Sequence, residues 1–431
     1  MRLPFHLGRI HYAWVVVAAV AVVLMAGAGV RASFGVFIKP MEAEFGWDRV
    51  SLSTVAALSM FLYGAIGPVV GRLADRWGPR GVLMAGALLL GAGTLGSAHV
   101  SSLWQLYVTA GIITAFGAGG AAMSVAASTT MRWFDSKTGV VIGIFGAGLA
   151  AGQLLVIPIA MALTVAWGWR AAYLVLGAGF LVLVLPLAGI LVRNAPSDMG
   201  LERYGAAEKS APQSRSEASK ERTSIWKAVR CLPFWLLAGS YWVCGYTTSG
   251  LVLTHLIPYT TEQGFPASQA AQALGLMGAL NIVGTIGSGW LCDRFGPKTP
   301  LICFYLLRGL SLVLLPMVGT APGLFGFAAA YGLNYISTVP ATTAMTAKLF
   351  GRYSVGELSG WIFLSHQLGA AFGATLGGYF YQWFGNYTLA FYSAAGMAFV
   401  AAFMILAIRE KPSDDRLAGV PAALGANEPG Y

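Results

Sequence analysis

The sequence predicts an all-α membrane protein in which twelve transmembrane helices form two pseudo-symmetric six-helix halves. Three observations lead to this fold class: the composition, a series of long apolar segments and an internal repeat. Of the 431 residues, 57% are hydrophobic and only 10% are charged, whereas about 25% of the residues in an average soluble domain are charged. The 56 glycines also fit membrane helices, where small residues allow close packing.

Twelve apolar segments are each long enough to cross a bilayer, which takes about 20 residues as a helix. Helices are expected because lipid offers no hydrogen-bond partner to an open strand edge. The first segment has features of a cleaved signal peptide, but its apolar run continues to Ile38 and favours a membrane span. The segments centre near Ala21, Phe61, Leu89, Ala115, Ala147, Leu181, Ser249, Ala279, Leu312, Asn334, Gly369 and Phe399.

A repeat relates the two halves. Residues 71–80 read GRLADRWGPR, and 218 positions later residues 289–298 read GWLCDRFGPK. We therefore expect an N-terminal half over residues 1–192 and a C-terminal half over residues 228–411. The interval 193–227 is a hydrophilic linker and residues 412–431 are a tail. Both are too polar to bury much apolar surface, so we expect most of the linker to be disordered or loosely helical.

The cations in the loops predict the topology. They gather in the loops on one side of the bilayer, which places both termini and the linker in the cytoplasm of a cell membrane, the inner membrane if the source is bacterial. The formal net charge of +10 comes from these loops and not from a basic face, so we expect no nucleic acid partner. The expected partner is a lipid bilayer. We also expect a monomer. The cations on the cytoplasmic side are Arg2, Arg9, Arg72, Arg76, Arg80, Arg132, Lys137, Arg294, Lys298, Lys348, Arg352, Arg409 and Lys411, against Lys39, Arg49 and Arg170 on the other.

Motifs for enzymes and metal sites are missing from the sequence. It has no Walker loop, no catalytic triad pattern and no H-E-x-x-H, so we expect neither an enzyme nor a cofactor. Its cysteines, Cys231, Cys244, Cys292 and Cys303, show no C-x-x-C spacing. We expect four buried thiols that form neither disulfides nor a metal site.

The repeated turn resembles the loop between the second and third helices of the major facilitator superfamily, and its copy resembles the loop between the eighth and ninth. Three further stretches resemble monocarboxylate transporters and, in part, the oxalate/formate antiporter group: RASFGVF at 31–37, WFDSKTG at 133–139 and WGWRAAY at 167–173. The resemblance implies alternating access between the two halves about a central site.

Two basic side chains within the membrane are candidates for the substrate site. Arg31 lies in the outer part of the first segment, where the resemblance implies a cation that contacts a substrate carboxylate; the alternative is an arginine that snorkels to the interface. His366 lies deep in the eleventh segment, where the resemblance implies a substrate-binding cation; the alternative is a neutral histidine bonded to another helix. We assign a structural role to His255 and to Arg308.

Several uncharged polar residues of the C-terminal half are further candidates for hydrogen bonds to substrate, or for bridges between helices. The sequence also departs from the family: the anion-binding arginine of the eighth helix has no counterpart between Ala267 and Cys292. This favours a larger or less charged substrate than lactate or oxalate. These candidates are Asn281, Thr285, Tyr331, Asn334, Tyr335 and Tyr246.

The repeated turns supply a candidate cytoplasmic gate. By resemblance, their aspartates pair with arginines or with the N-termini of opposing helices and hold the cytoplasmic side shut. The gate residues are Asp75, Arg76, Arg80, Asp293 and Arg294.

The charges inside the membrane predict the function. None of the 17 acidic residues lies in the middle of a segment, so the interior favours an anion and the coupling proton is assigned to His366. We therefore expect a secondary transporter of a small organic anion, coupled to protons or to anion exchange. Two alternatives remain: an exporter of amphipathic or aromatic compounds, and a transporter-like sensor that binds a ligand without moving it.

Overall fold

The computed structural model describes residues 11–47, 49–206 and 223–409. Within these ranges the regular structure is helical, apart from a single bridge between Phe134 and Tyr204. The α-helices are α1 Tyr12–Ala32, α2 Phe34–Phe45, α3 Arg49–Trp77, α4 Pro79–Ser97, α5 Leu103–Leu106, α6 Thr114–Gly120, α7 Met123–Trp133, α8 Thr138–Gly179, α9 Leu185–Leu191, α10 Ile225–Ala228, α11 Leu232–Gly245, α12 Leu253–Glu262, α13 Ala267–Phe295, α14 Lys298–Leu314, α15 Ala321–Asn334, α16 Thr338–Phe350, α17 Val355–Phe384 and α18 Thr388–Ala407.

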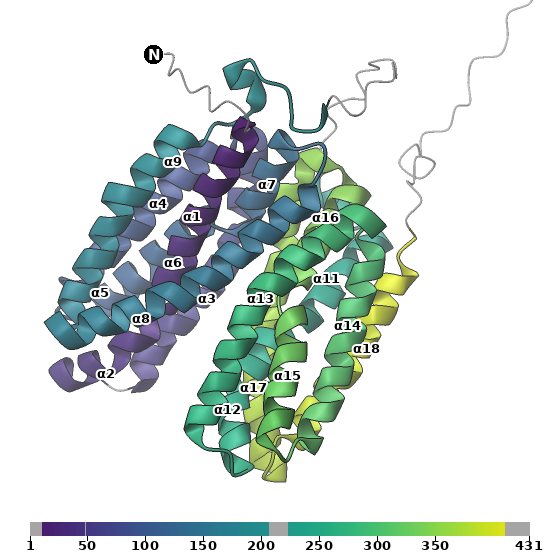
Figure 1. Cartoon of the computed structure of the whole chain (residues 1–431). Helices are drawn as coiled ribbons and strands as arrows, with labels where there is room; N and C mark the ends of the chain where they lie inside the picture. The colour runs from purple at the N-terminus through teal and green to yellow at the C-terminus, as the bar shows by residue number, and fades with distance from the viewer. Residues whose placement is uncertain (1–10, 48, 207–222, 410–431) are drawn as a thin grey trace, which may run out of the picture.

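These elements form twelve transmembrane helices in two bundles, α1–α9 and α10–α18, which stand side by side in Figure 1. Eight stretches in the described part of the chain are long and apolar enough to be recognised as spans by length and composition alone. One of them, Thr138–Leu191, has 54 residues and holds two spans, because Gly168 with φ +83° breaks the helical path. The remaining spans are α11 with α12, α15 with α16, and α17, which contains the polar residues His366 and Gln367.

Helix interruptions recur at equivalent places in the two halves. The first span breaks at Ser33, and its counterpart in the second half contains a π-helical segment, Tyr246–Val252. The fourth span breaks at residues 121–122 and the tenth at residues 335–337. Pro340 explains the last break, since its ring would clash with the carbonyl of Ile336 in a continuous helix. Broken helices of this kind are a pointer to the binding site of a transporter.

The two halves meet mainly along two pairs of helices, α3 with α17 and α8 with α13, and also where α7 packs on α17 and α8 on α16. Glycines face each other in both pairs, so the backbones can approach closely. A Cβ atom added to Gly71 would lie 2.1 Å from the carbonyl oxygen of Gly356, and one added to Gly289 would lie 2.1 Å from the carbonyl oxygen of Gly139. No side chain larger than hydrogen fits at these contacts without moving the helices apart.

This contact gives a first prediction. Gly289→Val should lower the thermal midpoint of the purified protein, because the new Cβ would overlap the Gly139 carbonyl and separate α8 from α13. Gly287→Val is a matched control on the same helix, since a Cβ there meets no atom within 4 Å. A scan of both variants in detergent checks the prediction, and equal midpoints would contradict it.

One end of the molecule, the upper end in Figure 1, carries the start of α1, residues 193–206 and the end of α18, and we call it the linker end. The sequence predicts that most of the linker is disordered or loosely helical, but its residues 193–206 make specific contacts with the N-terminal half. Trp133 Nε1 donates to the Arg193 carbonyl (3.1 Å), and the Tyr204 N–H donates to the Trp133 carbonyl (3.0 Å). The Tyr204 ring also packs on Trp14 at 5.6 Å. These contacts give residues 193–206 a defined conformation, which their polar composition alone does not predict. Residues 207–222, like Arg2, Arg9 and Lys411, lie outside the described ranges.

The cysteines agree only partly with expectation. All four are free, and Cys244 and Cys292 are buried, but Cys231 is half-buried and Cys303 is exposed. The prediction of four buried thiols is therefore wrong for the last two. Cys303 lies on α14, where a small apolar side chain can face lipid as well as protein.

Candidate functional site

Arg31 lies in the last turn of α1, just before the break at Ser33. Its guanidinium carbon sits 4.6 Å from the centre of the Tyr63 ring on α3, a cation–π contact. Among the described residues, Arg31 makes no hydrogen bond and no ion pair, and its side chain is only half-buried. A guanidinium has five N–H donors, so this cation has its binding capacity available.

A row of rings leads from Arg31 across the interface between the halves. Tyr63 packs edge-on against Phe363 of α17, with centroids 5.4 Å apart, and Phe363 stacks on His366 at 5.8 Å. His366 in turn packs against Tyr241 of α11 at 4.9 Å. We call these four residues the aromatic row. The structure thus links Arg31 and His366, which are 335 positions apart in the sequence, through the rings of Tyr63 and Phe363.

His366 is 9% exposed, and its Nδ1 lies 3.1 Å from Oε1 of Gln367. Because an amide oxygen only accepts, this hydrogen bond assigns a proton to Nδ1 and leaves Nε2 to take up a second one. The thiol of Cys244 is the other polar neighbour of the imidazole. The imidazole thus lies beside one amide and one thiol.

The two repeated turns make matching contacts at the linker end. The carboxylate of Asp75 accepts hydrogen bonds from the N–H groups of Gly356 (3.2 Å) and Glu357 (2.9 Å), at the start of α17. The carboxylate of Asp293 accepts from those of Gly139 (2.7 Å) and Val140 (2.9 Å), at the start of α8. Each aspartate thus caps a helix of the opposite half, where free N–H groups and the helix dipole favour a negative charge.

The arginines assigned to the gate lie elsewhere. Arg80 stays within the N-terminal half, where its Nη2 donates to the Gly189 carbonyl (2.6 Å). The guanidinium of Arg76 lies 5.9 Å from the ring centre of Trp77, and that of Arg294 lies 5.5 Å from that of Trp290. The structure therefore places the aspartates across the interface and these three cations beside their own halves.

Comparison with known proteins identifies the family. The family model for the Major Facilitator Superfamily matches residues 17–321 and 286–426, which is most of the chain. This chain belongs to the Major Facilitator Superfamily. Two solved structures of superfamily transporters share the fold over 92% of the chain: a proton:xylose symporter, XylE, with a TM-score of 0.70 and 15% identity, and FucP in an outward conformation, with a TM-score of 0.67 and 14% identity.

Curated relatives within the superfamily include monocarboxylate transporters. The chain is 28% identical to monocarboxylate transporter 11 of Mus musculus, over 93% of this chain and 89% of the relative. It is 24% identical to monocarboxylate transporter 12 of Rattus norvegicus, over 97% and 89%. An uncharacterised transporter of Bacillus subtilis, YcxA, is 26% identical over 83% and 86%.

The polar residues of the C-terminal half surround Arg308. This arginine of α14 is fully buried, and its Nη2 donates to the carbonyls of Asn334 and Tyr335, both at 2.8 Å. Nη1 lies 3.4 Å from Oγ1 of Thr247. Arg308 thereby satisfies the carbonyls that the break between α15 and α16 leaves open, and it binds that break to the π-helical segment of the seventh span.

The candidate residues near this break already have protein partners. Oδ1 of Asn281 accepts from the Ile336 N–H at 3.0 Å, and Thr285 donates to the Asn281 carbonyl at 2.9 Å. The hydroxyl of Tyr331 donates to the Thr247 carbonyl at 2.8 Å. The others lie in the same region: Asn334 is 2% exposed, Tyr246 1% and Tyr335 half-buried. His255 lies farther out, where its Nε2 is 2.9 Å from the Ala374 carbonyl.

Sequence analysis missed an ion-pair cluster at the linker end. Arg352 of the C-terminal half pairs with Asp135 of the N-terminal half and donates to the carbonyls of Met131 (2.6 Å) and Phe134 (2.8 Å). Arg203 of the linker also pairs with Asp135 (3.5 Å). Burial raises the pKa of Asp135, but the hydrogen bonds and charges of Arg352 and Arg203 outweigh it, so the pKa of this carboxyl lies below its ordinary value. A signal was present, because Asp135 and Arg352 are 217 positions apart, the offset of the repeated glycines, and carry opposite charges.

Tyr63, Phe363, Tyr241 and Gln367 were also missed. Aromatic residues are common throughout this chain, at 12%, so no single ring stood out. The repeat gave one indication that Tyr63 could belong to the site. Tyr63 lies 218 positions before the candidate residue Asn281, so the two occupy equivalent places in the two halves. Only the packing of α3 on α17 shows that Tyr63 lies between Arg31 and the second half.

Proposed function

We propose that this member of the superfamily is a secondary transporter of an organic anion of the monocarboxylate type, which works by alternating access between the two halves. One observation carries the proposal: Arg31 is a cation at the junction of the halves with no hydrogen-bond or ion-pair partner among the described residues. A carboxylate can bind a guanidinium through two parallel hydrogen bonds. The names of the curated relatives are consistent with such a substrate.

The charges around Arg31 support an anion. The carboxylates of Asp75 and Asp293 lie at the linker end, and that of Glu44 lies at the opposite end. None of these three carboxylates contacts the aromatic row. No carboxylate among the described residues forms an ion pair with Arg31. A charge that loses its water is costly unless it is paired. An anionic substrate that displaces water from Arg31 would at the same time supply the counter-ion of the guanidinium.

His366 is the proposed coupling group. Histidine is the side chain that most readily changes its charge near neutral pH. A protonated imidazole would add a second positive charge on the far side of the aromatic row and raise the affinity for an anion. By linkage, the bound anion must favour protonation by the same free energy. Tyr241, Phe363, Gln367 and Cys244 are neighbours of the ring. The buried Arg308 of α14 also acts electrostatically on Cys244.

The linker end is proposed to be cytoplasmic, with the Asp75 and Asp293 caps as the contacts that hold the halves together there. The loop cations support this orientation. A cysteine introduced at Ser214, which lies outside the described residues, should react with an impermeant maleimide only after cells are permeabilised. Reaction in intact cells would reverse the proposed topology.

The aromatic row also favours a second candidate, an exporter of amphipathic or aromatic compounds. Flat apolar molecules stack on rings, and α13 carries no arginine between Ala267 and Cys292 that would add a second anchor for a carboxylate. The two candidates differ in one respect: an exporter of neutral or cationic compounds does not need the charge of Arg31.

A thermal-shift screen of the purified protein separates these candidates. Monocarboxylates of increasing size should each be compared with the matched primary amide, which keeps the shape and removes the charge. A ligand at 100 times its Kd stabilises the folded state by about 2.7 kcal/mol. We expect one or more carboxylates to raise the midpoint while their amides do not. Equal shifts for acids and amides would favour the exporter.

A further inference from the structure

Polar groups from four helices meet at the buried thiol of Cys244 on α11. Its sulfur lies 3.1 Å from Oγ1 of Thr338 on α16, and its other polar neighbours are the imidazole of His366 on α17 and the guanidinium of Arg308 on α14. The helices α11 and α17 pack tightly at this level, because a Cβ atom added to Gly245 would overlap the His366 carbonyl oxygen. We call Cys244, Thr338, His366 and Arg308 the thiol cluster.

Arg308 is fully buried, and among the described residues no aspartate or glutamate pairs with it. Its hydrogen-bond acceptors are two main-chain carbonyls, an amide oxygen and a hydroxyl, all of them neutral. A buried charge is costly unless it is paired as well as hydrogen-bonded. The surroundings of Arg308 therefore favour a negative charge on the sulfur of Cys244 beside it.

Apart from Arg308 and His366, the ionisable groups around the thiol are phenols. Tyr305 and Tyr331 each donate to a main-chain carbonyl, at 2.7 and 2.8 Å, so both keep their protons. A thiol is also a stronger acid than a phenol, which makes Cys244 the most acidic group beside the guanidinium. The phenols that interact electrostatically with Cys244 are Tyr241, Tyr305, Tyr331 and Tyr335.

The other elements packed on α11 are α16, α18 and the π-helical segment of the seventh span. The titratable residue of α16 is Lys348, ten positions beyond the threonine of the cluster, and that of α18 is Tyr392, which is exposed. Tyr246 of the π-helical segment bonds through its hydroxyl to a serine of α18. In the part of the chain that the structure describes, the charged partners of the thiol are therefore Arg308 and His366.

The hydrogen bonds around the sulfur leave its own proton without the usual carbonyl. Cys231 shows the usual arrangement, because its thiol donates to the Lys227 carbonyl, four residues before it. The equivalent carbonyl for Cys244 is that of Ser240, which accepts from the Tyr305 hydroxyl instead. The thiol proton of Cys244 therefore needs another acceptor.

The hydroxyl of Thr338 makes the sulfur an acceptor. A threonine within a helix commonly donates to the carbonyl four residues before it, which here is that of Asn334, but this carbonyl accepts from Arg308 at 2.8 Å. The recorded partner of the Thr338 hydroxyl is the Cys244 sulfur. Since buried hydroxyls donate their hydrogen wherever they can, the sulfur receives it.

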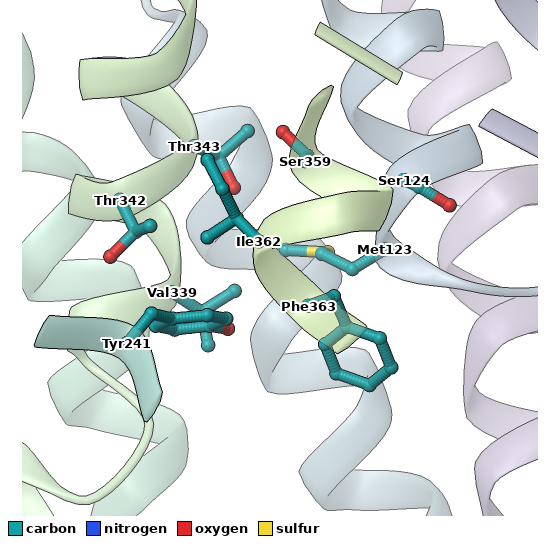
Figure 2. A pocket seen from close by; sticks show the side chains of 9 residues that line it. All are labelled: Met123, Ser124, Tyr241, Val339, Thr342, Thr343, Ser359, Ile362 and Phe363. Carbon is teal, nitrogen blue, oxygen red and sulfur yellow. The ribbon is translucent and has the colours of Figure 1, made fainter. Parts of the chain in front are cut away.

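Tyr241 and Phe363, the rings that pack on His366, also line a small cavity of about 20 Å³ between the halves (Figure 2). Figure 2 shows its lining residues, which come from α7, α11, α16 and α17. Neither Cys244 nor His366 is one of them. The thiol does not open onto this cavity, so the proton acceptor beside it is Nε2 of the imidazole, whose Nδ1 proton is held by Gln367.

We propose that Cys244 is a thiolate that acts as the counter-ion of Arg308, its proton having moved from the sulfur to Nε2 of His366. The S–H bond breaks and an N–H bond forms, so the imidazole becomes an imidazolium that keeps its Nδ1–H bond to Gln367. The sulfur is then surrounded by three donors: the Thr338 hydroxyl, the guanidinium and the Nε2–H group. Thiolates are favoured beside arginine and protonated histidine.

The thiolate gives Cys244 a part in coupling, an assignment that rests on the proposed function of His366. Cys244 is a positioning residue here, because it acts on the substrate only through the imidazole. Without the negative charge on the sulfur, the proton at Nε2 is held less firmly. Cys244→Ser should therefore move the pH midpoint of uptake in proteoliposomes to lower pH, by about one unit or more, while Cys292→Ser leaves it unchanged.

Infrared spectroscopy of the purified protein tests the charge of the sulfur directly, because a thiol has an S–H stretching band and a thiolate has none. The difference spectrum between the unmodified protein and Cys244→Ser should contain no S–H band at pH 7. Cys292→Ser is the matched control, since Cys292 is also a buried free thiol, and its difference spectrum should contain the band. Cys244→Ala replaces the serine variant if that variant does not fold.

Variants of Arg308 test whether its charge holds the thiolate. In Arg308→Met, measured below its unfolding temperature, the S–H band of Cys244 should appear, whereas Arg308→Lys keeps the charge and should not show it. Thr338→Val serves as a second variant in which the band should appear on mild acidification before it does in the unmodified protein.

An S–H band of Cys244 in the unmodified protein at pH 7 would overturn the proposal, and so would its absence in both Arg308→Met and Thr338→Val. The infrared result needs no transported substrate, so it stands or falls separately from the proposed transport of an anion. An unchanged pH midpoint of uptake in Cys244→Ser would overturn the part of Cys244 in coupling.

Discussion

Arg31→Ala is expected to abolish accumulation of the transported anion in proteoliposomes while the protein still folds. The guanidinium makes no hydrogen bond or ion pair in the described structure, so its removal leaves no buried group without a partner. The substrate carboxylate, by contrast, would lose its counter-ion. Removing one partner of a desolvated charge pair costs about 2–5 kcal/mol, so the apparent affinity should fall by about 30-fold or more.

Two variants make this result interpretable. Arg31→Lys keeps the charge but loses the paired geometry of the guanidinium, so it should retain part of the uptake. Arg76→Ala removes an exposed arginine near Trp77 and should leave substrate affinity unchanged. Thermal midpoints of all three variants should match that of the unmodified protein. Normal uptake by Arg31→Ala would leave Arg31 as an anchor at the membrane interface and would remove the main support for an anionic substrate.

Arg308→Met is expected to have the largest effect on stability. The methionine side chain can fill much of the same space, but it cannot donate to the carbonyls of Asn334 and Tyr335. Each buried carbonyl left without a partner costs about 1–3 kcal/mol. The variant should therefore unfold at a markedly lower temperature in detergent, with the break between α15 and α16 as the weak point.

The control for Arg308 is Arg294→Met, at a position where the guanidinium lies beside the Trp290 ring at the surface; a change of no more than about 0.5 kcal/mol is expected there. Arg308→Lys should be intermediate, because an ammonium group can reach one carbonyl but does not reproduce the fork of the guanidinium. If Arg308→Met is as stable as the unmodified protein, an apolar interior is equally good at this position. The arginine would then need an explanation in transport.

The sequence by itself determined the class of the fold and the relation between the halves. Length, apolar segments and the repeat at 218 positions predict the twelve helices, since lipid permits few alternatives to a helix. The same repeat identifies Asp75 and Asp293 as candidate gate residues, because a charged turn that occurs in both halves indicates the same structural role in each. Arg31 and His366 stand out for an equally direct reason: each is a basic residue in a stretch that is otherwise apolar.

The tertiary structure decided which of the polar residues are available for binding. Asn281, Tyr331 and Arg308 read in sequence as polar groups within the membrane, as Arg31 does, but they hold the break between α15 and α16. The partners of Arg31 and His366 are rings from α3, α11 and α17, and no local pattern relates residues that far apart. Local periodicity determines helices, whereas the contents of a site depend on which helix faces meet, and that is set by packing over the whole chain.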